Sequence, residues 1–285
     1  MSKRTRSGEA AAERAAYDIV ASVRTDKGCV RETNEDSGQM FRPADAAVLR
    51  ERGVLVVVAD GMGGHSSGEV ASRMAVELVS RLYYEADGDA QEALSGAVAE
   101  ANRQIYAASQ EDEGRQGMGT TCTALALLGG AAFAAHVGDS RLYMLRAGQI
   151  YQLTEDDSHV MELVRHGLIS KEEARTHEDK NVILRALGTA PEVEVSAVSP
   201  VEAREGDYYL LSSDGLHDLV RDEEIARVLA GAADVHAAAE QLIALAKERG
   251  GHDNITVGIV GLASPAASLP EAQNMRATRE VEAAR

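Results

Sequence analysis

The chain has 285 residues, and its 45% hydrophobic content suffices for a sizeable core in one or two domains. Its formal net charge of −17 argues against nucleic acid and anionic membranes as general partners. No apolar run reaches about 18 residues, so we expect no membrane span. The two isolated cysteines lack CxxC spacing and no secretory signal is evident, which together favour a cytoplasmic protein.

The first half of the chain predicts a tail, a buried strand and two helices. Residues 1–16 are rich in Ala, Glu, Arg and Ser without a dense apolar face, so we expect a flexible tail. The unbroken apolar run 54–59 predicts a strand covered on both faces. Two core-facing helices are indicated by apolar residues at helical spacing, namely Val70, Met74, Leu78 and Leu82 in one and Leu94, Val98, Ala101 and Ile105 in the other.

The second half predicts a hairpin of residues 120–128 and 131–137, a strand at 142–145 and a charged helical insertion at 154–188. Three histidines in the insertion, His159, His166 and His177, could form a metal cluster, but solvated side chains on charged helices are the interpretation we favour. A last amphipathic helix and a strand at 255–262 precede a second tail at 264–285. With no internal repeat or long linker, we expect one catalytic domain spanning residues 17–263.

Carboxylates next to glycine or small residues recur at predicted strand ends. Asp60 follows the buried strand and precedes Gly61, whose carbonyl is free to join it in coordination. Asp139, Asp214 and Asp253 occupy similar boundaries further along the chain. Because gathered carboxylates repel one another, their convergence requires protonation or divalent cations. An all-oxygen ligand set without Cys or an HExxH pattern favours Mg²⁺ or Mn²⁺ over zinc.

Six motifs, taken together and in order, resemble a known family. They are RETNED (31–36), VVADGMGGH (57–65), GMGTT (117–121), HVGDSR (136–141), LLSSDGL (210–216) and GGHDN (250–254). The chain resembles the bacterial form of the metal-dependent serine/threonine protein phosphatases of type 2C over residues 17–262. This resemblance implies an α+β fold, a four-layer αββα sandwich of two mainly antiparallel sheets flanked by helices. The insertion at 154–188 resembles the helical flap that lies beside the active site in this family.

The resemblance also implies metal ligands. Asp60 would bridge two Mn²⁺ or Mg²⁺ ions, the Gly61 carbonyl would serve one, and Asp214 with Asp253 would hold the other. Asp139 matches a third, weaker metal site shared with Asp214; the alternative is a structural carboxylate in a turn. A water shared by two divalent ions loses its proton readily and can attack phosphorus in line.

Arg31, Glu35 and Asp36 complete the predicted site. The planar guanidinium of Arg31 can hold two phosphate oxygens of the substrate, although a surface arginine is the alternative. Glu35 and Asp36 would accept hydrogen bonds from metal-bound waters. Met62 stands where animal members of the family carry a proposed general acid, and a thioether cannot donate a proton. The proton would come from a metal-bound water, which we favour, or from His65 or His159.

The predicted function is hydrolysis of phosphoserine and phosphothreonine in proteins, opposing bacterial Ser/Thr kinases. Other possibilities are a phosphoprotein-binding module without turnover, a phosphatase of a sigma-factor regulator, and a small-molecule phosphomonoesterase with the same site. A binding module would lack a metal ligand or the phosphate arginine, and none is missing from the motifs.

Overall fold

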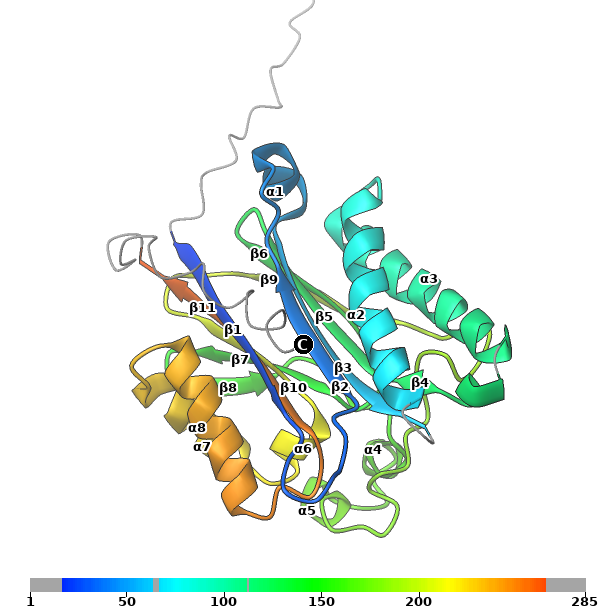
Figure 1. Cartoon of the computed structure of the whole chain (residues 1–285). Coiled ribbons are helices and arrows are strands. Elements are labelled where there is room, and N and C mark those ends of the chain that lie inside the picture. Colours follow the sequence, from blue (N-terminus) through cyan, green and yellow to red (C-terminus); the bar gives the residue numbers. More distant parts are fainter. Residues whose placement is uncertain (1–16, 64–66, 112, 265–285) are drawn as a thin grey trace, which may run out of the picture.

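The structure is a computed structural model that describes residues 17–63, 67–111 and 113–264. Apart from residue 264, both predicted tails lie outside the described residues, and so does His65. The described part contains two antiparallel sheets packed face to face, with helices on both outer faces (Figure 1). This is the expected α+β, four-layer αββα sandwich.

The first sheet joins the two ends of the described chain. Its strand order is β1 (Asp18–Asp26), β11 (Ile255–Ala263), β10 (Tyr208–Ser212), β7 (Arg141–Arg146) and β8 (Gln149–Gln152). β1 pairs with β11 along its whole length, from Asp18 opposite Ala263 to Asp26 opposite Ile255. The helices α7 (Asp222–Gly231) and α8 (Val235–Glu248) pack on its outer face through a core that includes Leu210, Leu242 and Ile259.

The second sheet has the order β2 (Asp36–Phe41), β3 (Val54–Met62), β5 (Cys122–Leu128), β6 (Ala131–Val137) and β9 (Ser196–Glu202), and the short β4 (Gly119–Thr120) also pairs with β3. The helices α2 (Ser67–Glu85) and α3 (Ala90–Glu111) cover its outer face. The short α1 (Ala46–Arg52) joins β2 to β3, and a 3₁₀ turn, η1 (Glu113–Arg115), follows α3.

β3 is buried on both faces, as its unbroken apolar run predicts. Val56 and Val58 belong to the core between the sheets, whereas Leu55, Val57 and Ala59 face the helices. The strand does not end with the apolar run, however, because it continues through Asp60 and Gly61 to Met62. Asp60 lies opposite Asp36 on β2, and Gly61 lies opposite Thr120 on β4. The backbone at Asp60 is therefore fixed by strand pairing.

The predicted core residues of the two helices differ in how deeply they are buried. On α3, the predicted residues Leu94, Val98, Ala101 and Ile105 are all buried. On α2, the buried positions instead include Ala71, Ala75, Val79 and Tyr83, one residue after each predicted position. Val70, Met74, Leu78 and Leu82 pack against the same core but stay partly exposed. Small alanine side chains let α2 approach the sheet closely, so the longer side chains flank the contact instead of filling it.

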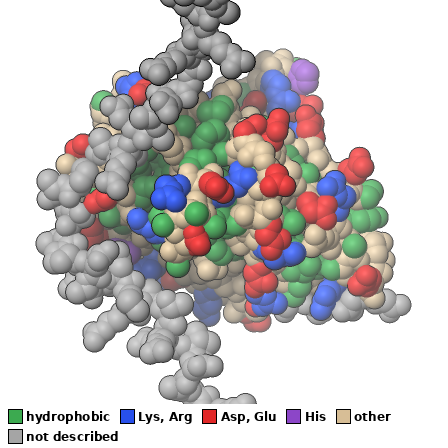
Figure 2. All heavy atoms as spheres, turned by 90° about the horizontal axis from the view of Figure 1, so that it is seen from above, with side chains coloured by type: hydrophobic (Ala, Val, Ile, Leu, Met, Phe, Trp, Pro, Cys, Tyr) green, Lys and Arg blue, Asp and Glu red, His purple; other side chains and the backbone are tan. Residues whose placement is uncertain are grey.

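The predicted helical insertion at 154–188 contains only two short helices, α4 (His159–Arg165) and α5 (Lys171–Ala174). Its first residues are buried, although the sequence suggested a charged helical segment. Asp156 accepts three hydrogen bonds from Arg141, and Asp157 pairs with Arg185. On the face turned upward in Figure 1, acidic and basic side chains lie among one another, in keeping with the acidic composition (Figure 2).

Candidate metal centre

The predicted carboxylates converge on one end of the sandwich from both sheets. Asp36 begins β2 and faces Asp60 of β3 across the strand pair. Asp214 is the first residue of α6 (Asp214–His217), directly after β10, and Asp253 lies just before β11. Asp139 lies between β6 and β7. Burial is the main cause of a strongly raised pKa at Asp60, and the charges of the other four carboxylates add to it.

The same electrostatic pressure acts on the other members of the group. Burial raises the pKa of Asp36 to about 6 and that of Asp139 to about 7. The pKa of Asp214 is raised well above its usual range, mainly by burial and next by the charge of Asp139. Each of these carboxyls is therefore harder to ionise than an exposed aspartate. A divalent cation would supply the positive charge that lets all of them ionise.

Three oxygens of this group lack hydrogen-bond partners. Within the described residues, Oδ1 of Asp36, Asp139 and Asp214 are buried side-chain atoms that accept no hydrogen bond. Buried oxygens are normally satisfied, so these three are suited to ligating a cation. No three His, Cys, Asp or Glu side chains in the described segments could by themselves enclose one ion. An open oxygen set of this kind fits Mg²⁺ or Mn²⁺, which bind through one or two carboxylates and keep several waters.

Glycines after two of the aspartates permit close backbone packing. A Cβ on Gly61 would lie 2.2 Å from the Gly68 carbonyl oxygen and 2.4 Å from that of Glu35. A Cβ on Gly215 would lie 1.9 Å from the Asn254 carbonyl oxygen. Any side chain at either position would push these segments apart. The Asp-Gly pairs therefore allow α2 and the 250–254 loop to pack directly beside the carboxylates.

Polar side chains join the two sheets at the centre. Ser213 Oγ donates to Asp36 Oδ2 at 2.7 Å and accepts from the Thr256 amide at 2.9 Å. Asn254 Oδ1 accepts from the Glu35 amide at 2.8 Å, and Asn254 Nδ2 donates to Thr33 O at 2.9 Å. Asn254 thus positions the loop that carries Glu35 and, through its own backbone, Asp253. The role of Asn254 depends on contacts between segments far apart in the sequence. The sequence motif that contains Asn254 therefore did not reveal this role.

Arg31 lies at the centre, where it contacts a predicted metal ligand. Its Nη2 donates to Asp253 Oδ2 at 2.7 Å, and the side chain is 50% exposed. Glu35 also lies near this group, and burial raises its pKa. The half-exposed guanidinium can bind a phosphate that approaches the cluster of aspartates from solvent.

Met62, which cannot donate a proton, and the two histidines considered for protonating the leaving group have different positions. Met62 ends β3, His65 lies outside the described residues, and His159 begins α4. A further histidine, His217, ends the helix that begins with Asp214 and was not considered from the sequence. Its Nδ1 lies 3.1 Å from Ser212 Oγ, and burial lowers its pKa well below the usual value. His217 is therefore uncharged at neutral pH and is a poor proton donor there.

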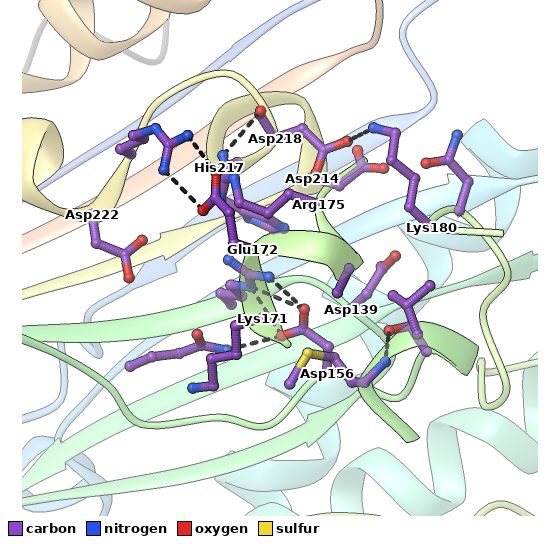
Figure 3. Close-up of a pocket in the computed structure, with 18 of the residues that line it drawn as sticks. Asp139, Asp156, Lys171, Glu172, Arg175, Lys180, Asp214, His217, Asp218 and Asp222 are labelled. Carbon is purple, nitrogen blue, oxygen red and sulfur yellow. Dashed lines mark hydrogen bonds and ion pairs between the residues drawn. The ribbon is translucent and has the colours of Figure 1, made fainter. Parts of the chain in front are cut away.

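A cleft of about 300 Å³ lies beside Asp139 and Asp214 (Figure 3). Its walls come from the 154–188 insertion on one side and from α6 and the start of α7 on the other. Arg141 lies under it with its guanidinium bound to both oxygens of Asp156, and Arg141 Nε reaches them at 2.9 and 3.0 Å. The sequence did not single out Asp156 or Asp218, because both became relevant only through the packing of the insertion.

Comparison with known proteins identifies the family. The family described as protein phosphatase 2C matches residues 32–248. The chain belongs to the protein phosphatase 2C family. It is 41% identical over 246 residues to the serine/threonine phosphatase stp of Listeria monocytogenes, covering 84% of this chain and 94% of the relative. It is 43% identical over 237 residues to the serine/threonine protein phosphatase PstP of Mycobacterium tuberculosis, covering 83% of this chain and 43% of that longer relative.

Solved structures agree with this membership in protein phosphatase 2C. The crystal structure of the M. tuberculosis phosphatase PstP has 40% sequence identity and a TM-score of 0.76, over 86% of this chain and 99% of that one. A structure of the PstP catalytic domain in complex with two manganese ions has 39% identity and a TM-score of 0.73, over 86% and 98% of the two chains. The present chain is therefore a protein phosphatase, a hydrolase, as the sequence resemblance implied.

Proposed function

We propose that the cluster of five aspartates holds two divalent cations, with which this protein phosphatase hydrolyses phosphoserine and phosphothreonine in proteins. One observation carries the proposal: five buried or half-buried aspartates from both sheets converge, and three of their oxygens accept no hydrogen bond within the described residues. The named activities of the relatives and the manganese bound by the PstP catalytic domain support the same conclusion.

Each residue has a proposed task. Asp60, with the Gly61 carbonyl, Asp214 and Asp253, would hold two Mn²⁺ or Mg²⁺ ions, and Asp139 with Asp214 would hold a third. When bound, such cations lower the pKa of a water and offset phosphate charge. Glu35 and Asp36 orient waters by accepting hydrogen bonds. Arg31 binds two phosphate oxygens of the substrate, which holds the phosphorus in place for in-line attack.

The proposed partners follow from this chemistry. They are phosphorylated proteins and the Ser/Thr kinases that phosphorylate them, in the cytoplasm, with residues 17–263 as the catalytic domain. In the described segments, no helix is long and apolar enough to cross a membrane. Nucleic acid is not among the partners we propose, given the net charge of −17.

Asp60→Asn tests the proposal, because it removes a charge that both cations would share. We expect hydrolysis of p-nitrophenyl phosphate and of a phosphothreonine peptide to require Mn²⁺ or Mg²⁺ and to stop in excess EDTA. In the variant, kcat should fall by about a thousandfold or more. Asp45→Asn is the matched control, since Asp45 only caps α1 and its replacement should leave kcat unchanged. Full activity of the dialysed wild-type enzyme in EDTA would refute the proposal.

A further inference from the structure

Arg175 connects the 154–188 insertion to the helix that begins with Asp214. It follows α5, whose start is fixed by a capping box in which the Ser170 amide donates to Glu173 Oε2 at 2.7 Å. From there the half-buried Arg175 side chain spans the cleft. Its Nη2 donates to the carbonyl oxygens of His217 at 3.0 Å and Asp218 at 3.2 Å (Figure 3).

These carbonyls lie at the carboxyl end of α6. The final carbonyls of a helix lack partners within the helix, and a cation there also complements the negative end of the helix dipole. α6 has only four residues, and Asp214 is the first of them. Near its other end, Gly215 packs closely against the Asn254 carbonyl, and this contact can act as a pivot. Because α6 is a single turn, a displacement of its carboxyl end tilts the turn about this pivot and changes the direction of the Asp214 side chain.

Two other contacts cross the cleft, but they differ in kind. Glu172 pairs with Arg221 at 2.8 Å, and both side chains are more than half exposed, so water and salt weaken this pair. Lys180 pairs with the side chain of Asp218. Arg175 alone among these cations bonds to the backbone of α6, and no ion pair to a carboxylate is seen for it in the described part of the chain.

We propose that Arg175 is a positioning residue that couples the insertion to the metal ligand Asp214. The inference rests on the proposed role of Asp214 in holding a cation. An insertion docked through Arg175 holds α6 in one position, so Asp214 is placed for ligation. Coupling between two sites is reciprocal, so a cation on Asp214 also stabilises the docked insertion. Arg175 does not contact the substrate phosphate in this proposal.

Two measurements on the full chain test the coupling without relying on activity. Calorimetry measures Mn²⁺ affinity, and hydrogen exchange with mass spectrometry measures protection of residues 159–187 in Mn²⁺ and in EDTA. In the wild type, Mn²⁺ should slow exchange in this segment. In Arg175→Ala, we expect about tenfold weaker Mn²⁺ binding and exchange that Mn²⁺ no longer slows. Arg175→Lys, which keeps a cationic donor, should give intermediate values.

Arg165→Ala is the matched control, because Arg165 is an arginine of the same insertion that pairs with the exposed Glu155. It should bind Mn²⁺ and show protection like the wild type. A purely structural role for Arg175 would lower the melting temperature in EDTA and leave the Mn²⁺-induced rise in melting temperature unchanged. Either that result, or equal affinity and protection in Arg175→Ala and wild type, would overturn the inference.

Asp214→Asn separates this inference from the proposed function. If wild type and Asp214→Asn bind Mn²⁺ equally, Asp214 is not a ligand and the proposed metal site is wrong. If Asp214→Asn loses binding while Arg175→Ala retains it, the metal site stands and the coupling through Arg175 is wrong.

Discussion

Asp36, Asp60 and Gly61 reach the metal centre from paired strands, whereas Asp139, Asp214 and Asp253 reach it from loops and one short helix. We call these the strand half and the loop half. β3 pairs with neighbours on both sides, so the backbone at Asp60 cannot move without breaking strand hydrogen bonds. The loop half instead depends on side-chain contacts made by Ser213, Asn254 and Arg175. The difference teaches that the proposed bridging ligand, Asp60, is fixed by strand pairing, while the other proposed ligands are held by replaceable side chains.

The largest expected effect breaks the strand half by adding one methyl group. Gly61→Ala places a Cβ against two backbone carbonyls, so we expect a loss of about 3 kcal/mol in the free energy of unfolding. Gly215→Ala meets one carbonyl, in the 250–254 loop that carries Asp253, so it should weaken Mn²⁺ binding more than it lowers stability. Gly96→Ala on α3 has open space and should be neutral or slightly stabilising. Urea denaturation measures the free energy of unfolding, and Mn²⁺ titration measures metal affinity. Equal changes in both quantities for Gly61→Ala and Gly215→Ala would contradict the difference between the strand half and the loop half.

A second prediction concerns Arg31, which lies between the loop half and solvent. Arg31→Ala should raise KM for a phosphopeptide about tenfold or more, because a charge-assisted bond to the substrate phosphate is lost. Metal affinity should change less, although Arg31 also contacts Asp253. The exposed Arg42→Ala serves as control. If calorimetry showed collapsed Mn²⁺ affinity with KM level, Arg31 would be a support for Asp253 instead of a phosphate ligand.

A third prediction separates Asp139 from the bridged pair. Asp139→Ala should retain the cations on Asp60 and lower kcat about tenfold, because a further cation near the phosphate can supply an acidic water for the leaving oxygen. Turnover should fall before substrate affinity does. A wild-type rate across the pH range, with Mn²⁺ saturating at the same concentration, would leave Asp139 as a structural residue of its turn.

The smallest expected effect is on stability without metal. The pKa of Asp36 is raised to about 6 and that of Asp139 to about 7, so the native chain binds protons that the unfolded chain releases above about pH 4. Stability in EDTA should therefore decrease as the pH rises from about 4 to 7. We expect a melting temperature a few degrees lower at pH 8 than at pH 5.5, and a larger Mn²⁺-induced rise at pH 8.

Asp139→Asn controls for the overall repulsion of an acidic chain, because it removes one titrating group and leaves nearly all the net charge. Its melting temperature in EDTA should vary less with pH than that of the wild type. A wild-type melting temperature that climbs between pH 5.5 and 8 in EDTA would contradict the assigned pKa shifts.

The sequence predicts the strand half of the site better than the loop half. A two-sided apolar run ending in Asp-Gly carries a local signal for Asp60, and the predicted strand, hairpin and α3 core positions follow from periodicity. On α2 the predicted residues also pack against the core, but the fully buried residues lie one position later. Asn254, Asp156 and His217 received no predicted role, since each is defined by partners distant in sequence. The burial at the start of the insertion was not predicted for the same reason. Asp157 is paired with Arg185, which lies at the other end of the insertion in the sequence.

The pairing of β1 with β11 has a consequence for synthesis in the cell. Asp18–Asp26 finds its strand partner only in Ile255–Ala263, so the first described strand stays without this neighbour until residues 255–263 have left the ribosome. Asp253 immediately precedes that last strand, and its neighbour Asn254 holds the loop carrying Glu35. A chain that ends before Asp253 therefore lacks part of the proposed centre and the partner strand of β1. We expect products of translation interrupted before that point to be inactive.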